Sequence, residues 1–284
     1  MMIDNQNKLT LLINSCDGYR DTWELFFSAL EEYWEKHPKV ILNTESNQDL
    51  SFKNVLISYL SPQESNFPWA KRLKKSVDKV QTELVLFTFD DYILESYVDN
   101  DEISKVIELM EKNENIAVVY LIHTDLDIEE VTLLQGNSQN KYYKIKDRTP
   151  FKLNSAPAIW RKSCLKNFTG DIEDPWAWEV FGTYKTYDSK YLFYTVSETD
   201  KDVYPYDYKK GGAIYRSKWV KSVVEDKILK YGLSIDINTR GYIEDAAPIK
   251  RSLKWKIGFL LQGMRMVDFK MYYFFRDTIK AKLK

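Results

Sequence analysis

The chain has 284 residues, of which 44% are hydrophobic and 29% are charged, and its net charge is −1. These values are typical of a folded protein with a large core, and they disfavour a general nucleic-acid-binding protein, which would be basic. Two cysteines exclude a disulfide framework, and two histidines exclude a histidine-based metal cluster. We expect no signal peptide, and no run of 18 apolar residues is present to span a membrane.

Apolar strands and amphipathic helices alternate through the first 125 residues. Strands are predicted at 9–14, 40–42, 55–59, 84–89 and 116–122, with helices at 67–80 and 102–111 and a further helix between the first two strands. That further helix is predicted to start at Asp21, with Glu24 completing a capping box, and to end at His37-Pro38. Such alternation predicts a mostly parallel sheet with helices on both faces, whose ligands bind outside the carboxyl ends of the strands.

Beyond residue 125 the pattern becomes irregular. Short aromatic strands are predicted at 142–145, 191–195 and 213–215, forming a smaller mixed sheet, with helices at 174–187 and 217–231. We therefore expect a first half at residues 1–125, a second half at 126–247 and a tail at 248–284.

The tail differs from the rest of the chain in charge. Residues 249–284 hold ten Lys and Arg against two Asp, a net charge of +8, whereas the other residues sum to −9. Apolar residues recur in the tail at steps of three and four, which predicts one amphipathic helix, or two with a break near Gly263. This basic, amphipathic pattern is typical of a segment that lies on an anionic membrane surface; the alternative is packing on the body or on a second subunit.

Two adjacent carboxylates, Asp90 and Asp91, follow the apolar strand 84–89. Neighbouring carboxylates repel each other and are costly to bury without a positive partner. A divalent cation that bridges to a diphosphate is such a partner, since Mg²⁺ is commonly held by one or two carboxylates plus phosphates and water. The alternative is an Asp pair that caps the following turn.

The loop after the first strand contains Ser15 and Asp17, which can hydrogen-bond a nucleotide base or ribose. The sequence has neither Gly-x-Gly-x-x-Gly nor a Walker motif, which disfavours a dinucleotide site and a P-loop kinase. Farther on, Trp69 can stack on a base and Arg72 can reach a phosphate. The alternatives are an ordinary polar loop and ordinary helix packing.

A second acidic segment places Asp174 and Glu179 around Trp176 and Trp178. Indole faces pack on sugar rings while carboxylates bind hydroxyls, and a carboxylate among aromatics has the raised pKa that a general base requires. The alternative is a core helix anchored by tryptophan. Gly211-Gly212, followed by Arg216 and Lys218, suits a basic loop over a diphosphate or a simple turn.

In this order and spacing, the motifs resemble bacterial nucleotide-sugar glycosyltransferases of the GT-A fold that assemble surface polysaccharides such as capsule, O-antigen or exopolysaccharide. The resemblance covers about residues 9–220. The motifs that carry it are Leu11-Leu-Ile-Asn-Ser-Cys-Asp-Gly-Tyr19, Leu42-Asn-Thr-Glu45, Trp69-Ala-x-Arg-Leu73, Phe89-Asp-Asp-Tyr92, Asp174-Pro-Trp-Ala-Trp-Glu179 and Gly211-Gly with Lys218-Trp219.

The resemblance implies a role for each of these positions. It implies a GT-A-like (Rossmann-like) fold and a nucleotide-sugar site, with a UDP- or dTDP-linked donor, made by Ser15, Cys16, Asp17, Thr44, Trp69, Arg72, Asp90 and Lys218. The family's Asp-x-Asp motif binds Mn²⁺ or Mg²⁺; here Asp90 and Asp91 are adjacent, so this chain departs from the motif. Inverting members of the family carry an acidic catalytic base at the start of a helix. The resemblance therefore implies Glu179 as the catalytic base, with Asp174 as second choice. It also implies that Trp176 and Trp178 bind the acceptor.

The implied reaction is an inverting single displacement by a hexosyltransferase-type enzyme. The implied acceptor is a glycan hydroxyl, carried on a lipid at the inner face of the cell membrane, with the protein cytoplasmic and peripheral. Two alternatives stay open: a sugar nucleotidyltransferase, and a non-catalytic carbohydrate-binding protein.

Overall fold

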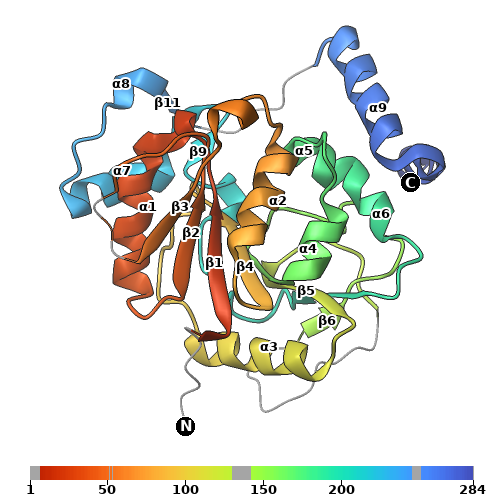
Figure 1. The fold of residues 1–284 in the computed structure, drawn as a ribbon, viewed down its shortest axis with the longest axis horizontal. Coiled ribbons are helices and arrows are strands. Elements are labelled where there is room, and N and C mark those ends of the chain that lie inside the picture. Colours follow the sequence, from red (N-terminus) through yellow and green to blue (C-terminus); the bar gives the residue numbers. More distant parts are fainter. Residues whose placement is uncertain (1–6, 51, 53, 130–141, 245–250, 284) are drawn as a thin grey trace.

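The computed structural model describes residues 7–50, 52, 54–129, 142–244 and 251–283. An eight-stranded sheet with the order β3-β2-β1-β4-β7-β5-β8-β6 forms its centre (Figure 1). The strands are β1 (Leu9–Asn14), β2 (Lys39–Asn43), β3 (Val55–Ser58), β4 (Leu84–Phe89), β5 (Ile116–His123), β6 (Tyr142–Lys144), β7 (Ala158–Arg161) and β8 (Leu192–Val196). All but β6 and β7 run in one direction, so the predicted mostly parallel α/β fold is confirmed.

The first half of the chain follows the prediction closely. Its helices are α1 (Arg20–Tyr33), α2 (Trp69–Lys79) and α3 (Asn100–Lys112). The predicted capping box is wrong, because Asp21 lies inside the first turn of α1 and Tyr19 takes the N-cap position. The helix also ends at Tyr33, before His37-Pro38.

The second half departs from the prediction in its strands. Strands β6 and β8 do not form a separate sheet but extend the central one, and the unpredicted strand β7 joins β4 to β5 in antiparallel pairing. Strand β7 has only four residues, all of them buried, so it carries no alternation that would mark it as a strand. Strands from both sides of residue 125 thus share one sheet.

Helices cover both faces of this sheet, as predicted. Alternate residues of β1, β2 and β4 pack on α1, α3 and α7 (Lys221–Tyr231) on one face, and their neighbours pack on α2 and α4 (Lys162–Phe168) on the other. Full burial of these strands on both sides explains their nearly continuous apolar sequences. In Figure 1 the N-terminus lies below the sheet, so the carboxyl ends of the parallel strands are at the top.

A small sheet lies beyond this edge, in the order β11-β10-β9. Its strands are β9 (Ile214–Tyr215), β10 (Lys218–Val220) and β11 (Tyr242–Ile243), and α8 (Ile237–Arg240) precedes β11. Both turn residues between β9 and β10, Arg216 and Ser217, have positive φ angles. Only the 213–215 segment of the three predicted short strands therefore belongs to a separate sheet.

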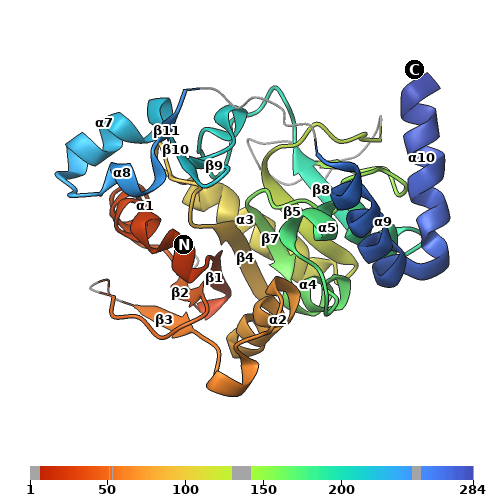
Figure 2. The ribbon, with the colours of Figure 1, turned by 90° about the horizontal axis from the view of Figure 1, so that it is seen from above.

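The tail forms two helices rather than one, α9 (Leu253–Val267) and α10 (Met271–Leu283), and the break lies at Asp268–Lys270 rather than near Gly263. They stand at the opposite end of the molecule from α7 and α8 (Figure 2). They pack on the continuous helical stretch of α5 (Pro175–Ala177), a π-helical turn at Trp178–Gly182 and α6 (Thr183–Thr186). Among the described residues, no helix is long and apolar enough to cross a bilayer.

Candidate active site

Polar side chains gather along the carboxyl edge of the sheet in an order set by the strands. Ser46 follows β2, Asp17 follows β1, and Asp91 follows β4. Because β7 is antiparallel, its start lies at the same edge, so Ser155 stands between the ends of β4 and β5. The edge therefore presents one continuous row of polar groups, which we follow from β2 to β5.

Asp90 is built into the scaffold of this row. It is almost fully buried, and its Oδ2 accepts hydrogen bonds from Ser15 Oγ (2.5 Å), Thr22 Oγ1 (3.0 Å) and Trp23 Nε1 (3.1 Å). Burial raises the pKa of Asp90 to about 7, although the three donors act in the opposite direction. The Asp90 carboxylate thus joins β4 to the first loop and to α1, and Ser15 belongs to the same hydrogen-bond network.

Asp91 has a different environment. It is half-buried, and among the described residues no cation pairs with its carboxylate. Burial, and then the neighbouring Asp90, raise the pKa of Asp91 well above its usual value. The loop before β9 presses against it, because Ala213 N donates to Asp91 O (2.7 Å) and a Cβ on Gly212 would lie 2.9 Å from that oxygen. The predicted glycine loop thus lies directly against the backbone of Asp91.

A second polar cluster ties the loops after β1 and β2 together. Asp17 Oδ1 accepts from Thr44 Oγ1 (2.7 Å) and Ser46 N (3.1 Å), and Asp17 N donates to Glu45 Oε2 (2.5 Å). Glu45 Oε1 pairs with Nη1 of the buried Arg72 (2.5 Å). Direct contacts therefore connect five positions: Asp17, Thr44, Glu45, Ser46 and Arg72. Glu45 binds the guanidinium of Arg72, which the sequence predicts to reach a phosphate.

The thiol of Cys16 lies between these two clusters. Burial, followed by the nearby Asp90 and Glu45 carboxylates, raises the pKa of Cys16 to about 11. The side chain is therefore a neutral thiol at ordinary pH and is no nucleophile.

Glu179 lies on the other side of Asp91, in the π-helical turn after α5. Its Oε1 accepts from Ser155 N (2.7 Å) and Ser155 Oγ (2.5 Å), and Tyr92 Oη donates to Ser155 Oγ (3.3 Å). This chain of contacts connects Glu179 to the residue after Asp91. Burial raises the pKa of Glu179, while the Ser155 hydrogen bonds act against the shift. π-Helical turns often occur at functional sites.

The two predicted acceptor tryptophans have opposite fates. Trp178 is fully buried against Trp69, Phe87 and Trp160, so its indole presents no face to a sugar. Trp176 is 60% exposed. The half-buried Trp69 packs edge-on against Trp178, with ring centroids 5.9 Å apart. Helix packing therefore describes Trp69 and Trp178 better than stacking on a ligand does.

The other predicted positions lie at the margins. Asp174 caps α5 by accepting from Ala177 N (2.8 Å), and it also lines a groove with Trp176 and α9. Lys218 is exposed on β10 and has no ion pair within the described chain. Asp174 is therefore occupied as a helix cap, and Lys218 remains a free cation on the hairpin.

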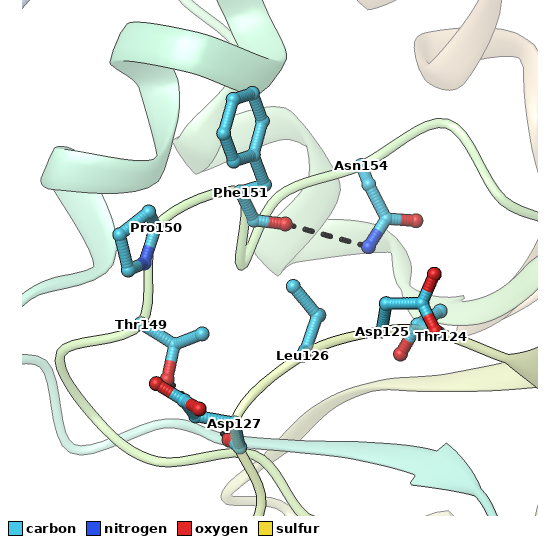
Figure 3. A pocket seen from close by; sticks show the side chains of 8 residues that line it. All are labelled: Thr124, Asp125, Leu126, Asp127, Thr149, Pro150, Phe151 and Asn154. Atoms are coloured by element: carbon cyan, nitrogen blue, oxygen red, sulfur yellow. Dashed lines mark hydrogen bonds between the residues drawn. The ribbon is translucent and has the colours of Figure 1, made fainter. Parts of the chain in front are cut away.

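An open cavity of about 460 Å³ continues the row past Glu179, at the end of β5 (Figure 3). It is lined by Thr124, Asp125, Leu126, Asp127, Thr149, Pro150, Phe151 and Asn154. Phe151 is half-exposed and has a positive φ of 57°, and Asn154 precedes Ser155, the partner of Glu179. The lining combines an aromatic ring with carboxylates, hydroxyls and an amide, and it contains no cation.

The donor set for a metal ion is small. Within the described ranges, no three His, Cys, Asp or Glu side chains come together to hold a metal. Asp90 is almost fully buried and its Oδ2 accepts from three donors, whereas Asp91 is half-buried, so Asp91 is the more accessible carboxylate. One carboxylate is sufficient for a divalent cation whose other ligands are phosphates and water, and Asp91 fits that role.

The sequence did not predict three features of this site: the contact of Ser155 with Glu179, the ion pair of Glu45 with Arg72, and the contacts of Arg240. Arg240 forms a two-pronged ion pair with Asp21 (2.6 and 2.5 Å), donates to Ser217 O (3.4 Å) and stacks over Tyr19. It thereby fastens the β9–β10 hairpin to the first loop. Glu45 belongs to the Leu42-Asn-Thr-Glu45 motif, but no sequence pattern indicates a role for Ser155 or Arg240.

Fold and site together define an α/β protein with a polar row at the carboxyl edge of its sheet. No family model and no curated protein match the chain. Among solved structures, it is similar to residues 1–349 of TarS of S. aureus, with 14% identity over 92% of this chain and 81% of that one, at a TM-score of 0.48. It is also similar to 2-C-methyl-D-erythritol 4-phosphate cytidylyltransferase from Thermus thermophilus, with 10% identity over 78% of this chain and 96% of that one, at a TM-score of 0.42. A third similar structure is the galactosyltransferase LgtC, with 9% identity over 59% of this chain and 61% of that one, at a TM-score of 0.34. All three TM-scores are below 0.5. The roles of individual residues are therefore argued from the strand order and the contacts of this structure.

Proposed function

We propose that this protein transfers a sugar from a nucleoside-diphosphate donor to a hydroxyl group of a glycan acceptor. The observation that carries the proposal is the order of groups along the edge: Asp91 under a glycine loop, then Tyr92 and Ser155, then Glu179. A half-buried carboxylate without a cation and a second carboxylate with a raised pKa, connected through Ser155 and Tyr92, suit a diphosphate leaving group and a general base.

The donor lies on the β1–β4 side in this proposal. The base and ribose contact the loop of Ser15, Cys16 and Asp17 and the Thr44 segment, where backbone and hydroxyl groups are held in place. Arg216 and Lys218, on the hairpin that Arg240 fastens to this loop, provide positive charge for the diphosphate. Charge stabilisation of a leaving group is commonly the largest catalytic contribution.

A divalent cation, held by Asp91 and by the donor phosphates, would neutralise negative charge on the leaving diphosphate. Gly212 leaves room beside Asp91, since its missing Cβ would lie 3.4 Å from Asp91 Oδ2. The hydrogen bonds of Asp90 keep the first loop beneath this position.

The acceptor lies on the β7–β5 side. Ser155 occupies Oε1 of Glu179, and no other described residue bonds Oε2, which is therefore free to take the proton of an acceptor hydroxyl. The hydroxyl oxygen then attacks the anomeric carbon as the bond to the diphosphate breaks, which inverts the configuration. The neighbouring cavity offers Phe151 as a ring for stacking and carboxylates for sugar hydroxyls.

The finer parts of the proposal concern the substrates. We propose a UDP- or dTDP-linked hexose as donor and a lipid-linked glycan of surface-polysaccharide assembly as acceptor. Trp176, which is exposed beside α9, remains a candidate for contact with the acceptor.

The decisive experiment is a thermal-shift panel with UDP, dTDP, GDP, CMP and ADP, each with Mn²⁺, Mg²⁺ or EDTA. A nucleotide at 100 times its Kd should add about 2.7 kcal/mol of stability. We expect one nucleoside diphosphate to stabilise the protein, and Asp91→Asn to weaken the part of the shift that EDTA removes. Asp127→Asn, which lies outside the proposed donor site, is the matched control.

Activity follows with the sugar-linked form of the nucleotide that binds. Release of free nucleoside diphosphate supports transfer or donor hydrolysis. Release of pyrophosphate from a nucleoside triphosphate and a sugar phosphate would instead identify a nucleotidyltransferase. Absence of any nucleotide shift, together with binding to sugars alone, would leave the carbohydrate-binding alternative in its place.

A further inference from the structure

The C-terminal helices are attached to the body through one apolar face. Val267 and Met271 are buried in a cluster with Phe181, Tyr184 and Tyr187. The contact is close: a Cβ on Gly263 would lie only 2.6 Å from the Phe181 ring. A glycine is therefore required where α9 crosses the π-helical turn, and the position of α9 on the body is fixed.

A second apolar face of the same two helices remains uncovered. Its residues are Leu253, Ile257, Leu261 and Met264 on α9 and Tyr272, Phe275, Ile279 and Leu283 on α10. Each side chain in this set, which we call the free stripe, is between 47% and 82% exposed. Both spacings follow one side of a helix. The single stripe expected from the sequence thus divides into a docked face and a free one.

Unpaired cations accompany the free stripe. Lys254, Lys256 and Arg265 on α9 and Lys280 and Lys282 on α10 are exposed and make no ion pair within the described chain. Residues 251–283 contain eight Lys and Arg against two Asp, and Asp277 is occupied by Arg276 and Tyr187. A second copy placed on the stripe would bring two such basic surfaces together, whereas an anionic surface would complement them.

Two exposed tryptophans, Trp255 at the start of α9 and Trp176 on α5, lie beside cations. A groove of about 590 Å³ lies between α5 and α9, and Trp176, Trp255, Arg251 and Lys254 contribute to its lining. Arg251 stacks on Trp255 at 4.8 Å and on Trp176 at 5.9 Å. Tryptophan beside cations is typical of side chains at the headgroup level of a bilayer. Trp176 belongs to the body, so the surface extends from the tail onto the body.

From these contacts we propose that the free stripe and the Trp176–Trp255 groove form the surface by which the protein binds an anionic bilayer. The apolar side chains enter the headgroup layer while the four lysines and Arg265 face lipid phosphates. The protein lies on the membrane and does not span it. The proposal rests on the proposed function only for its purpose, which is to bring the site to a lipid-linked acceptor.

The test is co-sedimentation of the full chain with vesicles of phosphatidylcholine alone or with about 30% phosphatidylglycerol, an anionic lipid. We expect binding to the anionic vesicles, and its loss at high salt. Ile257→Glu/Leu261→Glu should abolish binding, and Lys254→Gln/Lys256→Gln should weaken it about 25-fold, since each lysine near an anionic surface contributes about a factor of five. Quenching of tryptophan emission by brominated lipid should fall in Trp255→Phe.

Matched controls on the body are Leu229→Glu and Lys36→Gln/Lys39→Gln, which change exposed residues of the same kinds and should leave binding unchanged. Equal binding to neutral vesicles, or no binding to either, overturns the proposal. Self-association that Ile257→Glu/Leu261→Glu removes, without vesicle binding, would assign the stripe to a second copy. The assay contains no nucleotide, so its result is independent of the thermal-shift test.

Discussion

The two ends of the polar row differ in how their charges are satisfied. On the β1–β4 side, Asp90 holds three donors, Asp17 holds two, and Arg72 pairs with Glu45. On the β7–β5 side, Glu179 has a single partner residue, and the nearby Asp125 and Asp127 are exposed. Asp91 stands between the two ends and belongs with the second, because no side chain of the described residues donates to its carboxylate, unlike the carboxylates of Asp90 and Asp17. Asp90 is almost fully buried and accepts from three donors, so it builds the scaffold, whereas the half-buried Asp91 and Glu179 remain available for chemistry.

The largest expected effect concerns Glu179. Glu179→Gln keeps the shape but removes the basic oxygen, so transfer should fall about 10²- to 10⁴-fold, the usual contribution of a general base. Steady-state assays of sugar transfer measure this loss, and the nucleotide-induced thermal shift should be unchanged. Glu24→Gln, an exposed position on α1, is the control. Retention of turnover by Glu179→Gln would remove this residue from the role of base.

The next effect separates the adjacent carboxylates by stability. Asp90→Ala removes the shared acceptor of two hydroxyls and an indole N–H in a buried site, and should cost about 2–4 kcal/mol of unfolding free energy. Asp91→Ala removes a carboxylate without a cation and should cost less than about 1 kcal/mol. Urea unfolding of the two variants gives the comparison. Similar losses for both would contradict the assignment of Asp90 as scaffold and Asp91 as functional.

A smaller effect tests the loop over Asp91. Gly212→Ala places a methyl group 2.9 Å from Asp91 O at a positive φ, and should destabilise the protein by about 1–3 kcal/mol and weaken nucleotide binding. The control is Gly211→Ala, which also has a positive φ but meets nothing within 4 Å. The difference between the two variants isolates the contact with Asp91. If both behave alike, the loop does not constrain the carboxylate.

The finest effect is in the pH profile of transfer. Because burial raises the pKa of Glu179, the residue gains its proton at a higher pH than an ordinary glutamate. The base works only without that proton, so activity should decline on the acid side at a pH above the usual glutamate range of about 4.3. Ser155→Ala removes the hydroxyl donor that stabilises the charged form, while the backbone N–H donor stays, and should move this limb to higher pH. A limb that stays in place would show that Glu179 does not control it.

The sequence predicted most where local chemistry decides the structure. Strands 9–14 and 84–89 are apolar runs bounded by polar turns, and their parallel order brings Ser15 and Asp90 to one edge. Strand β7 was missed because its four residues depend on β4 and β5 for pairing. The sequence predicted that both Trp176 and Trp178 contact the acceptor, but in the same helical stretch Trp176 is exposed and Trp178 is buried. Burial of Trp178 depends on packing against distant segments, including Trp69 of α2, which local sequence does not indicate. The contacts of Ser155 and Arg240 depend on segments far apart in the chain.

Arg240 has a consequence for how the protein is made. Its ion pair with Asp21 joins residues 219 positions apart, and its other contacts fix the loop after the first strand to the β9–β10 hairpin. During synthesis the first strand and its loop leave the ribosome long before their partner does. The loop proposed to hold the nucleotide therefore acquires its final anchor only after residue 240 has been translated, so nascent chains released before that point would have the sheet but an unfastened nucleotide loop.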